Sequence, residues 1–487
     1  MERRKFLAAG GALPIALRTM VPDGTETSTF RPRAPAVRSD ERFEEMVKIV
    51  ESGMREHNVP GVALGVIKDG QIQLRSLGVT SVDDPRPVTD DTLFWIASLS
   101  KTFAATAAMT LVQQGKLDLD APLRRVIPDF RVQDEEVSAT VTLRHLLTQS
   151  AGWEATYNVE EGEGALGRWV PTMRDNIQLS PPGRVWSYNN PSAGLVGRMI
   201  EVVTGMEYRD ALRALVLNPV GLDRTTTHVY ELVTWPVAVS HRPGRDGKPV
   251  VTRPYERGSS IPAGGVNSSI RSLMKYIAFH LGEHDGDGAG ALSSAARKAM
   301  TEPQLRKEPT GEEMGIGFHL RTLNGVRTVS HGGSSGAFMA FVPERRFGFA
   351  VISNQASNGW RVRMAVEDAL LKAYEGLALT PNQPIIGYRG QTETLRHVTP
   401  LATQPQAAAY VGRYRQSRTN VNEVRAAPSG GLLLGSGDNV TEARFYGPDL
   451  AVTVGGANPG ISYTFIRDAD QVRWMRGAGQ VSRKEGR

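Results

Sequence analysis

Strand-like segments lie on both sides of a long helical region, and this order restricts the possible folds. Two apolar runs, Gly61–Lys68 and Gln71–Leu77, are joined by Asp69-Gly70, a dipeptide typical of a β-hairpin turn. The chain between Leu93 and about Leu305 is mainly helical in pattern. Strand patterns return at Gly317–Thr322, Val326–Val329, Ala337–Val342 and Phe347–Ser353. We therefore expect an α+β fold with one antiparallel sheet that is completed by both ends of the domain.

Helical patterns next to these strands indicate the limits of the main domain. A helix is expected from Asp40 to about Glu56, and a second one, with an apolar stripe, over Gly359–Ala378. The sheet would therefore be flanked by helices within a domain of residues 36–378. An all-helical subdomain, at about residues 100–300, would be inserted between the two halves of the sheet.

The last hundred residues differ in pattern from the main domain. Residues 379–405 are rich in proline and weakly patterned, which is typical of a linker. Residues 406–487 contain short alternating runs separated by Gly, Pro, Asn and Asp, which predicts a small antiparallel barrel or sandwich. This segment carries no recognisable catalytic motif, so a lid, a substrate gate, an oligomer contact and a passive spacer all remain open as its role.

The first residues have the outline of an export signal. Arg3 and Arg4 precede Phe6 and an apolar segment of about 11 residues, as in twin-arginine signals. We expect residues 1–35 to be a signal and leader, and the mature protein to be periplasmic or secreted. The alternative is a short basic tail. No uncharged apolar run reaches the roughly 18 residues of a membrane span, so no transmembrane anchor is expected in the mature protein.

Composition excludes several classes of function. The chain has no cysteine, which excludes disulfides, thiolate metal sites and a cysteine nucleophile. The net charge of +6 comes from dispersed arginines without a basic block beyond the N-terminus, so we expect no nucleic-acid partner. Neither an H-E-x-x-H motif nor a P-loop is present, and we expect no metal and no cofactor.

A serine and a lysine at a strand-to-helix junction are the strongest candidates for catalysis. Ser98 follows the strand-like run Thr92–Ala97 and precedes an apolar helix. Residues three apart share one face of a helix, so the Lys101 amine can reach the Ser98 hydroxyl, next to the unpaired N–H groups of the helix start. Burial would lower the pKa of Lys101 and make it a base for acyl transfer. The alternative is a lysine that extends to solvent from a core helix.

The same S-x-x-K spacing occurs a second time, at Ser272 and Lys275. The apolar residues around this pair recur at helical spacing on the other face, so we interpret both side chains as solvated surface. The four-residue pattern is therefore not specific by itself, and its surroundings must distinguish the two copies.

Two further segments offer a proton-transferring group, a substrate anchor and a second oxyanion donor for an acyl-transfer site. Tyr188, beside a lysine ammonium, can act as a base and then as an acid, and Asn190 can hold a substrate amide. The alternative is a helix-capping asparagine beside a core tyrosine. At His331-Gly332-Gly333-Ser334 a strand ends, and its glycines allow a substrate to approach the backbone. The N–H of Ser334 can therefore be an oxyanion donor.

In this order and context, the motifs resemble those of the serine β-lactamase and penicillin-binding-protein family. The resemblance covers roughly residues 40–376 and is strongest to the branch of class C β-lactamases, D-Ala-D-Ala carboxypeptidases, D-aminopeptidases and related esterases. The segments that carry it are Phe94–Thr102, His145–Gly152, Pro182–Asn190, Pro262–Val266 and His331–Gly336.

The resemblance implies a sheet domain joined to a helical domain with the active site between them, and a C-terminal barrel similar to the lipocalin-like appendages of some members. It implies that Ser98 is the nucleophile, that Lys101 and Tyr188 transfer protons, and that Asn190 anchors the substrate. The N–H groups of Ser98 and Ser334 would bind the oxyanion.

One departure from the family pattern concerns the substrate. Class C β-lactamases and many penicillin-binding members have Lys-Thr-Gly where this chain has His331-Gly332-Gly333, and a neutral histidine is a weaker carboxylate partner than lysine at pH 7. The similarity to D-aminopeptidases and esterases favours a serine hydrolase that cleaves ester, amide or D-amino-acid peptide bonds, with small molecules or peptides, including peptidoglycan-derived ones, as substrates. The alternatives are a β-lactamase or D-Ala-D-Ala carboxypeptidase, and an envelope protein that binds penicillin or peptidoglycan without turnover.

Overall fold

The computed structural model describes residues 40–253, 257–283, 291–377, 399–436, 439–454 and 460–486. The signal expected at residues 1–35 and most of the linker expected at residues 379–405 lie outside these ranges. The described chain confirms the α+β class, because it contains an antiparallel sheet flanked by helices and a closed C-terminal barrel.

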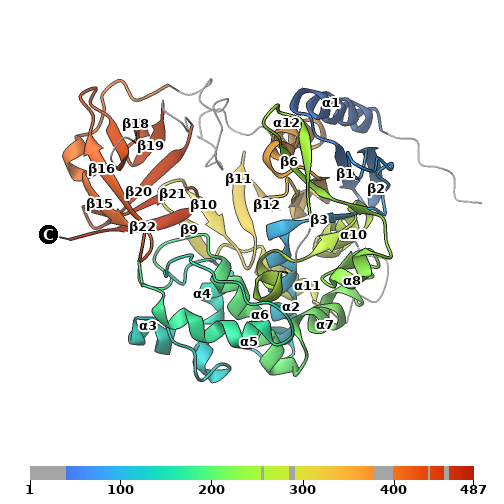
Figure 1. Cartoon of the computed structure of the whole chain (residues 1–487), viewed down its shortest axis with the longest axis horizontal. Coiled ribbons are helices and arrows are strands. Elements are labelled where there is room, and N and C mark those ends of the chain that lie inside the picture. Colours follow the sequence, from blue (N-terminus) through green and yellow to red (C-terminus); the bar gives the residue numbers. More distant parts are fainter. Residues whose placement is uncertain are drawn as a thin grey trace, which may run out of the picture. The chain divides into compact units, whose positions relative to one another are not determined.

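An eight-stranded antiparallel sheet forms the centre of the main domain (Figure 1). Both ends of the domain contribute to it, because Val62 of β1 pairs with Ser353 of β14, and Lys68 pairs with Phe347. The hairpin predicted around Asp69-Gly70 is confirmed. The strand order is β2 (Gln71–Gly78), β1 (Gly61–Lys68), β14 (Phe347–Ser353), β13 (Phe338–Val342), β12 (Val326–Gly332), β11 (His319–Leu323), β10 (Glu312–Met314) and β9 (Leu305–Lys307).

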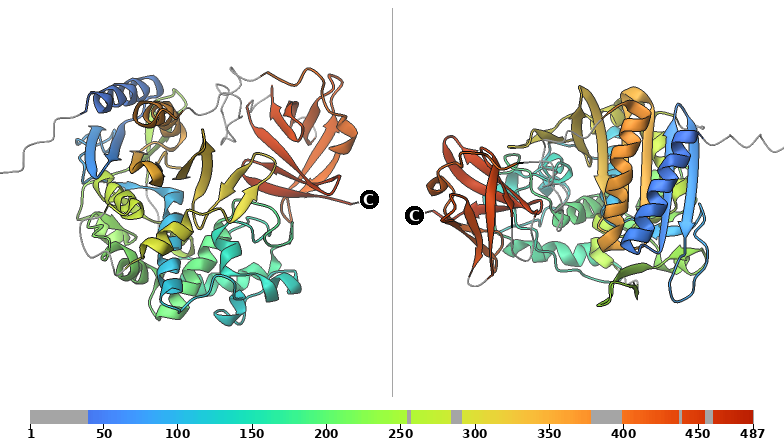
Figure 2. Two further views of the ribbon diagram at one scale, coloured as in Figure 1. Left: turned by 180° about the vertical axis from the view of Figure 1, so that it is seen from behind. Right: turned by 90° about the horizontal axis from the view of Figure 1, so that it is seen from above.

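Helices cover both faces of this sheet, which explains why β1 and β14 are almost wholly apolar in sequence. On one face, α1 (Glu41–His57) and α12 (Ala356–Glu375) lie side by side (Figure 2). Their contact is close, since a Cβ atom at Gly53 would lie 3.3 Å from the Val362 side chain. On the other face, α10 (Ile270–Leu281) packs against β1 and β14.

The chain between the two halves of the sheet is mainly helical, as expected, and its buried apolar side chains form one core with the inner face of the sheet. Its helices are α2 (Ser100–Gln113), α3 (Glu135–Thr140), α4 (Leu143–Leu147), α5 (Ala165–Trp169), α6 (Asn190–Thr204), α7 (Tyr208–Leu212), α8 (Val229–Leu232), α9 (Ile261–Gly264), α10 and α11 (Ser294–Met300). The strand expected within Thr92–Ala97 is present as β3 (Leu93–Trp95). The region also contains short strands that the sequence did not predict, namely β4 (Thr225–Thr226), β5 (Val237–Ala238), β6 (Ser240–Pro243), β7 (Pro249–Thr252) and β8 (Asn267–Ser268).

The C-terminal strands close into an eight-stranded barrel in which β15 pairs with β22. Buried aromatic and aliphatic side chains, including Tyr414 and Phe465, fill its interior. The strands are β15 (Gly412–Arg415), β16 (Val421–Ala426), β17 (Leu432–Ser436), β18 (Asn439–Gly447), β19 (Leu450–Thr453), β20 (Ser462–Asp468), β21 (Gln471–Gly477) and β22 (Gln480–Lys484). The barrel prediction is therefore confirmed, although β16 and β22 were not recognised in the sequence.

One sequence interpretation is wrong. Ser272 is 2% exposed, not solvated, because its Oγ accepts a hydrogen bond from the Arg224 N–H where α10 packs on the preceding loop. Lys275 reaches the surface, where its Nζ donates to the Gly221 carbonyl at 2.9 Å and lies 3.1 Å from the Asp223 carboxylate. In the second S-x-x-K pair, Ser272 therefore has a structural role, and the Lys275 ammonium contacts Gly221 and Asp223 instead of the serine hydroxyl.

Candidate active site

Ser98 lies in a 3₁₀ turn, Ala97–Leu99, between β3 and α2. Ala97 has a φ of 47°, a left-handed conformation that strains non-glycine residues and often accompanies functional sites. The turn leaves Ser98 half-buried at the wall of a cavity of about 440 Å³. The same cavity is lined by Tyr188, His331, Gly333 and Ser334. The structure thus brings together predicted site residues from three distant segments.

Lys101 lies one turn along α2 from Ser98, inside an apolar helix. The residue is 5% exposed, and its Nζ donates to Ser98 Oγ at 3.2 Å and to the Ala263 carbonyl at 2.8 Å. Burial lowers the pKa of Lys101 from 10.5 to about 7. The lysine therefore does not extend to solvent, and near neutral pH a large fraction of it is the amine that can accept a proton.

Tyr188 lies on the other side of the lysine. The Lys101 Nζ is 4.7 Å from the centre of the Tyr188 ring, within the range of a cation–π contact. The backbone of Tyr188 is fixed by the barrel, because its N–H donates to the Gly479 carbonyl at 2.7 Å. The Tyr188 ring is therefore held beside the Lys101 amine, on a cavity wall that also includes Ser98.

Asn190 is placed differently from the other predicted site residues. It is exposed at the first position of α6 and is not part of the cavity wall. The residue that caps this helix is its neighbour Asn189, whose side chain accepts from the Ser192 N–H and the Trp153 indole, both at 3.0 Å. The structure does not bring Asn190 together with the other predicted residues, and its role as a substrate anchor stays a prediction.

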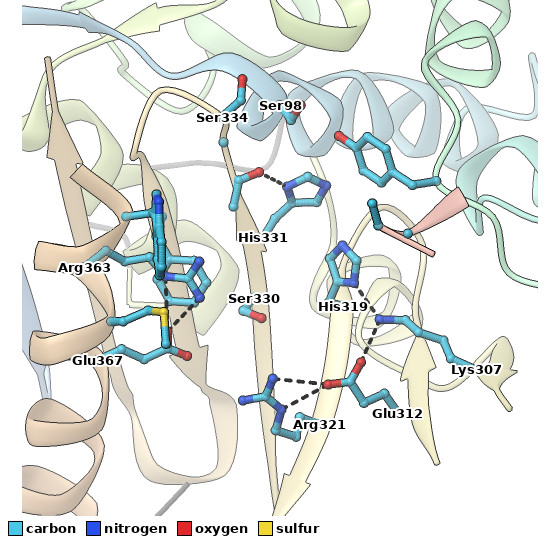
Figure 3. A pocket seen from close by; sticks show the side chains of 18 of the residues that line it. Ser98, Lys307, Glu312, His319, Arg321, Ser330, His331, Ser334, Arg363 and Glu367 are labelled. Atoms are coloured by element: carbon cyan, nitrogen blue, oxygen red, sulfur yellow. Dashed lines mark hydrogen bonds and ion pairs between the residues drawn. The ribbon is translucent and has the colours of Figure 1, made fainter. Parts of the chain in front are cut away.

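The loop after β12 lies directly against the Ser98 turn. A Cβ atom at Gly333 would be 2.3 Å from the Ile96 carbonyl oxygen, so only glycine allows the two backbones to approach this closely. The Gly333 N–H closes the loop by donating to the Ala337 carbonyl at 2.6 Å. This contact places Ser334 and its backbone on the Ser98 side of the cavity (Figure 3).

His331 is a neutral group in this structure. It is 4% exposed, and burial lowers its pKa to about 3, with a further contribution from the nearby Lys101 charge. The position that holds a lysine in the class C pattern therefore supplies no positive charge here.

A cluster of charged residues on the cavity wall was not predicted from the sequence (Figure 3). Glu312 lies 3.5 Å from the Lys307 ammonium and 3.1 Å from the Arg321 guanidinium, and Arg363 lies 2.7 Å from Glu367. Lys307 and Glu312 come from β9 and β10, which have three residues each. Runs this short, with charged residues at most positions, give no alternation from which a strand could be recognised.

The barrel contributes directly to the cavity through the hairpin of β21 and β22. Arg476 and Gly479 of this hairpin line the cavity. Three consecutive residues of the Tyr188 segment bond to it: the Trp186 carbonyl accepts from Arg476 at 3.4 Å, the Ser187 hydroxyl accepts from the Val481 N–H at 3.1 Å, and Tyr188 donates to Gly479. An apolar cluster lies beside these bonds and consists of Leu179, Val185, Ile466, Trp474 and Val481. The barrel is therefore part of the cavity wall and not a passive spacer.

Among the residues that the structure describes, no group of three His, Asp or Glu side chains is placed to hold a metal ion. Within the same ranges, no helix combines the length and the hydropathy needed to cross a membrane.

Comparison with known proteins gives matches over most of the chain. A family model described as Beta-lactamase matches residues 46–373. Penicillin-binding protein 4 of Amycolatopsis lactamdurans is 33% identical in an alignment of 318 residues that covers 62% of this chain and 82% of that protein.

Solved structures share the fold at lower identity. SurE, in a crystal structure with D-Leu, is 24% identical, with a TM-score of 0.74 over 91% of this chain and 100% of that chain. EstCE1, a hydrolase with promiscuous acyltransferase activity, is 18% identical, with a TM-score of 0.60 over 68% of this chain and 98% of that chain. The likeness to SurE thus extends beyond the main domain, since the main domain alone is shorter than 91% of the chain.

Proposed function

The chain belongs to the beta-lactamase family, and from this premise we propose that it is a serine hydrolase that cleaves ester, amide or D-amino-acid peptide bonds through an acyl-enzyme on Ser98. The family match confirms the resemblance inferred from the sequence, and the family consists generally of serine hydrolases. The observation that carries the proposal is the 3.2 Å contact between Ser98 Oγ and the buried Lys101, whose pKa is about 7.

The proposed reaction has two steps. In the first, Lys101 and Tyr188 remove the Ser98 proton while Oγ attacks the substrate carbonyl, and the N–H groups of Ser98 and Ser334 bind the oxyanion. The same pair returns the proton to the leaving oxygen or nitrogen as its bond to the carbonyl carbon breaks. In the second step the pair deprotonates a water molecule, which attacks the acyl carbon, and Ser98 Oγ regains a proton as it leaves.

The neutral state of His331 supports esters and D-amino-acid derivatives over substrates with a carboxylate beside the reacting bond. A β-lactam and a D-Ala-D-Ala peptide both carry such a carboxylate, and a neutral imidazole holds it less well than an ammonium does. SurE, which has the same fold, has a crystal structure with D-Leu, and this supports D-configured substrates, of which peptidoglycan-derived peptides are one source. The second candidate is penicillin binding without turnover, which the likeness to penicillin-binding protein 4 favours.

Acid-quenched turnover of a p-nitrophenyl ester tests the proposal. Mass spectrometry of the wild-type protein is expected to find the acyl group on Ser98, and Ser98→Ala is expected to lose both the adduct and the release of p-nitrophenol. Ser272→Ala removes the serine of the other S-x-x-K pair and serves as the matched control, which is expected to keep the adduct. Equal p-nitrophenol release by wild type and Ser98→Ala would show that Ser98 is not the nucleophile of this reaction.

The same preparation distinguishes the two candidate functions. With nitrocefin we expect turnover about 10- to 100-fold slower than with the ester, because the loss of one charged hydrogen bond to the substrate carboxylate costs about 1.5–3 kcal/mol. Fast nitrocefin hydrolysis would contradict the interpretation of His331. A stable penicillin adduct on Ser98, together with no ester turnover, would support the binding protein.

We further propose export through the twin arginines Arg3 and Arg4, with a periplasmic or secreted mature protein. Fractionation of cells that produce the full chain is expected to find the protein outside the cytoplasm. The Arg3→Lys, Arg4→Lys double variant keeps the charge and is expected to remain inside. Retention of the wild-type chain in the cytoplasm would refute the proposal.

A further inference from the structure

Basic side chains outnumber carboxylates on the wall of the cavity beside Ser98. The charged residues of this wall are Lys307, Arg321, Arg363 and Arg476, together with Glu312 and Glu367. The histidines of the wall add no charge, because burial lowers the pKa of His331 to about 3 and that of His319 well below its usual range. Arg363 and Glu367 form an ion pair at 2.7 Å, in which the two charges cancel. The three other cations are left with one carboxylate, a surplus of two positive charges.

Glu312 is the carboxylate that these three cations share. It lies 3.5 Å from the Lys307 ammonium and 3.1 Å from the Arg321 guanidinium. Arg476 donates instead to main-chain carbonyls, that of Glu308 at 2.8 Å and that of Trp186 at 3.4 Å. Its Nε is buried and has no hydrogen-bond partner in the described part of the chain. One guanidinium of the cavity wall therefore lacks a carboxylate of its own.

Burial makes this surplus of charge costly. Lys307 is 3% exposed and Arg476 is 2% exposed, so water screens neither charge well. Both cations lie over the same indole, because the Lys307 Nζ is 4.7 Å and the Arg476 Cζ is 5.2 Å from the centre of the Trp186 ring. Such cation–π contacts stabilise a cation but leave its charge in place. An anion that entered the cavity here would offset the surplus.

The cations are separated from the nucleophile by two neutral rings. Figure 3 shows the His331 ring between Ser98 and His319, and the His319 ring between His331 and Lys307. The two ring centres are 5.1 Å apart, and the Lys307 Nζ lies 2.6 Å from His319 Nδ1. A carboxylate directly beside the reacting bond would therefore lie nearer to His331 than to Lys307. An anion held by the cations must be several bonds further along the substrate.

We propose that Lys307, Arg321 and Arg476 form a subsite for an anionic group of the substrate, such as a carboxylate, at a distance of several bonds from the carbonyl that Ser98 attacks. This inference rests on the proposed hydrolase and narrows its substrates to esters or amides with a remote negative charge. Glu312 is a positioning residue, which holds Lys307 and Arg321 in place while its own charge weakens the binding of an anion.

Matched esters test the subsite in the wild-type protein. In one series the acyl group carries the charge, and mono-p-nitrophenyl adipate and suberate are compared with their methyl esters. In the other the leaving group carries it, and 4-acetoxyphenylacetate and 3-(4-acetoxyphenyl)propionate are compared with their methyl esters. In one of these series we expect the acid to exceed its methyl ester at least about tenfold in kcat/KM, as one charge-assisted hydrogen bond provides. That series identifies the side of the reacting carbonyl on which the subsite lies.

Two variants with opposite expected effects assign this gain to the cluster. Lys307→Met removes a positive charge and should lower the ratio of kcat/KM for acid and methyl ester about tenfold. Glu312→Gln removes the competing negative charge, keeps an oxygen that can accept from Arg321, and should raise the same ratio severalfold. A purely structural effect would slow the acid and the methyl ester alike and leave the ratio unchanged. Lys298→Met, on the exposed side of α11, is the matched control and should keep the wild-type ratio.

Equal kcat/KM for acids and methyl esters in both series would overturn the inference. A gain for the acid that neither Lys307→Met nor Glu312→Gln changes would overturn it too, because another group would then hold the anion. Turnover of p-nitrophenyl acetate by wild type and Ser98→Ala is measured alongside. If that turnover depends on Ser98 while the subsite fails its test, the proposed function stands without it.

Discussion

Replacement of Lys101 by methionine is expected to lower kcat/KM for a p-nitrophenyl ester by about 10³-fold or more, because it removes the base that accepts the Ser98 proton. The free energy of unfolding is expected to fall by no more than about 1 kcal/mol, since an apolar chain of similar length replaces a buried amine. Steady-state kinetics and guanidinium unfolding measure the two quantities. Lys275→Met is the matched control, and its kcat/KM should stay within about twofold of wild type.

The pH dependence of the same reaction has a defined sign. The neutral amine is the active form, so kcat/KM should rise with pH and reach half its plateau near the Lys101 pKa of about 7. The unfolded chain, with a lysine pKa near 10.5, binds more protons than the folded chain between about pH 7 and 10.5. The stability of wild type relative to Lys101→Met should therefore increase with pH over this window. A difference that is independent of pH would contradict the lowered pKa.

Trp474→Ala is expected to lower kcat/KM on the order of 10- to 100-fold, although this residue is in the barrel. Its side chain packs against Leu179 and Val185 of the main domain, and its indole donates to the Leu179 carbonyl at 2.9 Å. Loss of this packing weakens the contact that holds the Gly479 carbonyl against the Tyr188 N–H, and a base displaced by about 1 Å transfers protons poorly.

Trp474→Phe is the control for this variant, because it keeps most of the apolar contact and loses only the indole donor. Its kcat/KM should stay within about fivefold of wild type, as loss of one hydrogen bond of about 1 kcal/mol implies. Thermal unfolding checks that both variants are folded. A folded Trp474→Ala variant with wild-type turnover would show that the barrel does not position Tyr188.

Local patterns explain which parts of the fold were predictable. The Asp69-Gly70 hairpin was predictable because its turn needs a particular dipeptide. Long buried strands such as Phe347–Ser353 were predictable because continuous burial requires a run of apolar residues. The three-residue strands β9 and β10 have no such sequence pattern. Their positions depend on pairing, of β10 with β11 and of β9 with β10, and not on their own composition.

The site also contains features that the sequence predicts and features that it does not. The contact of Ser98 with Lys101 follows from helical spacing, a local property, whereas the place of Tyr188 rested on the family resemblance. The contact of Lys307 with His319, and that of Glu312 with Lys307, could not be predicted, since the pairing of the sheet edge alone brings these strands together. Nor could the backbone bonds from the barrel to Tyr188 be inferred, because a docking contact between two domains has no periodicity in either sequence.

The pairing of β1 with β14 affects the order in which the protein can fold during synthesis. β1 leaves the ribosome well before its partner β14, which follows only after the whole helical region. Until then β1 and β2 form a hairpin with an unpaired apolar edge. The central strands of the sheet can therefore assemble only after β14 is made, and the nascent chain exposes an unpaired apolar strand edge while the helical region is translated.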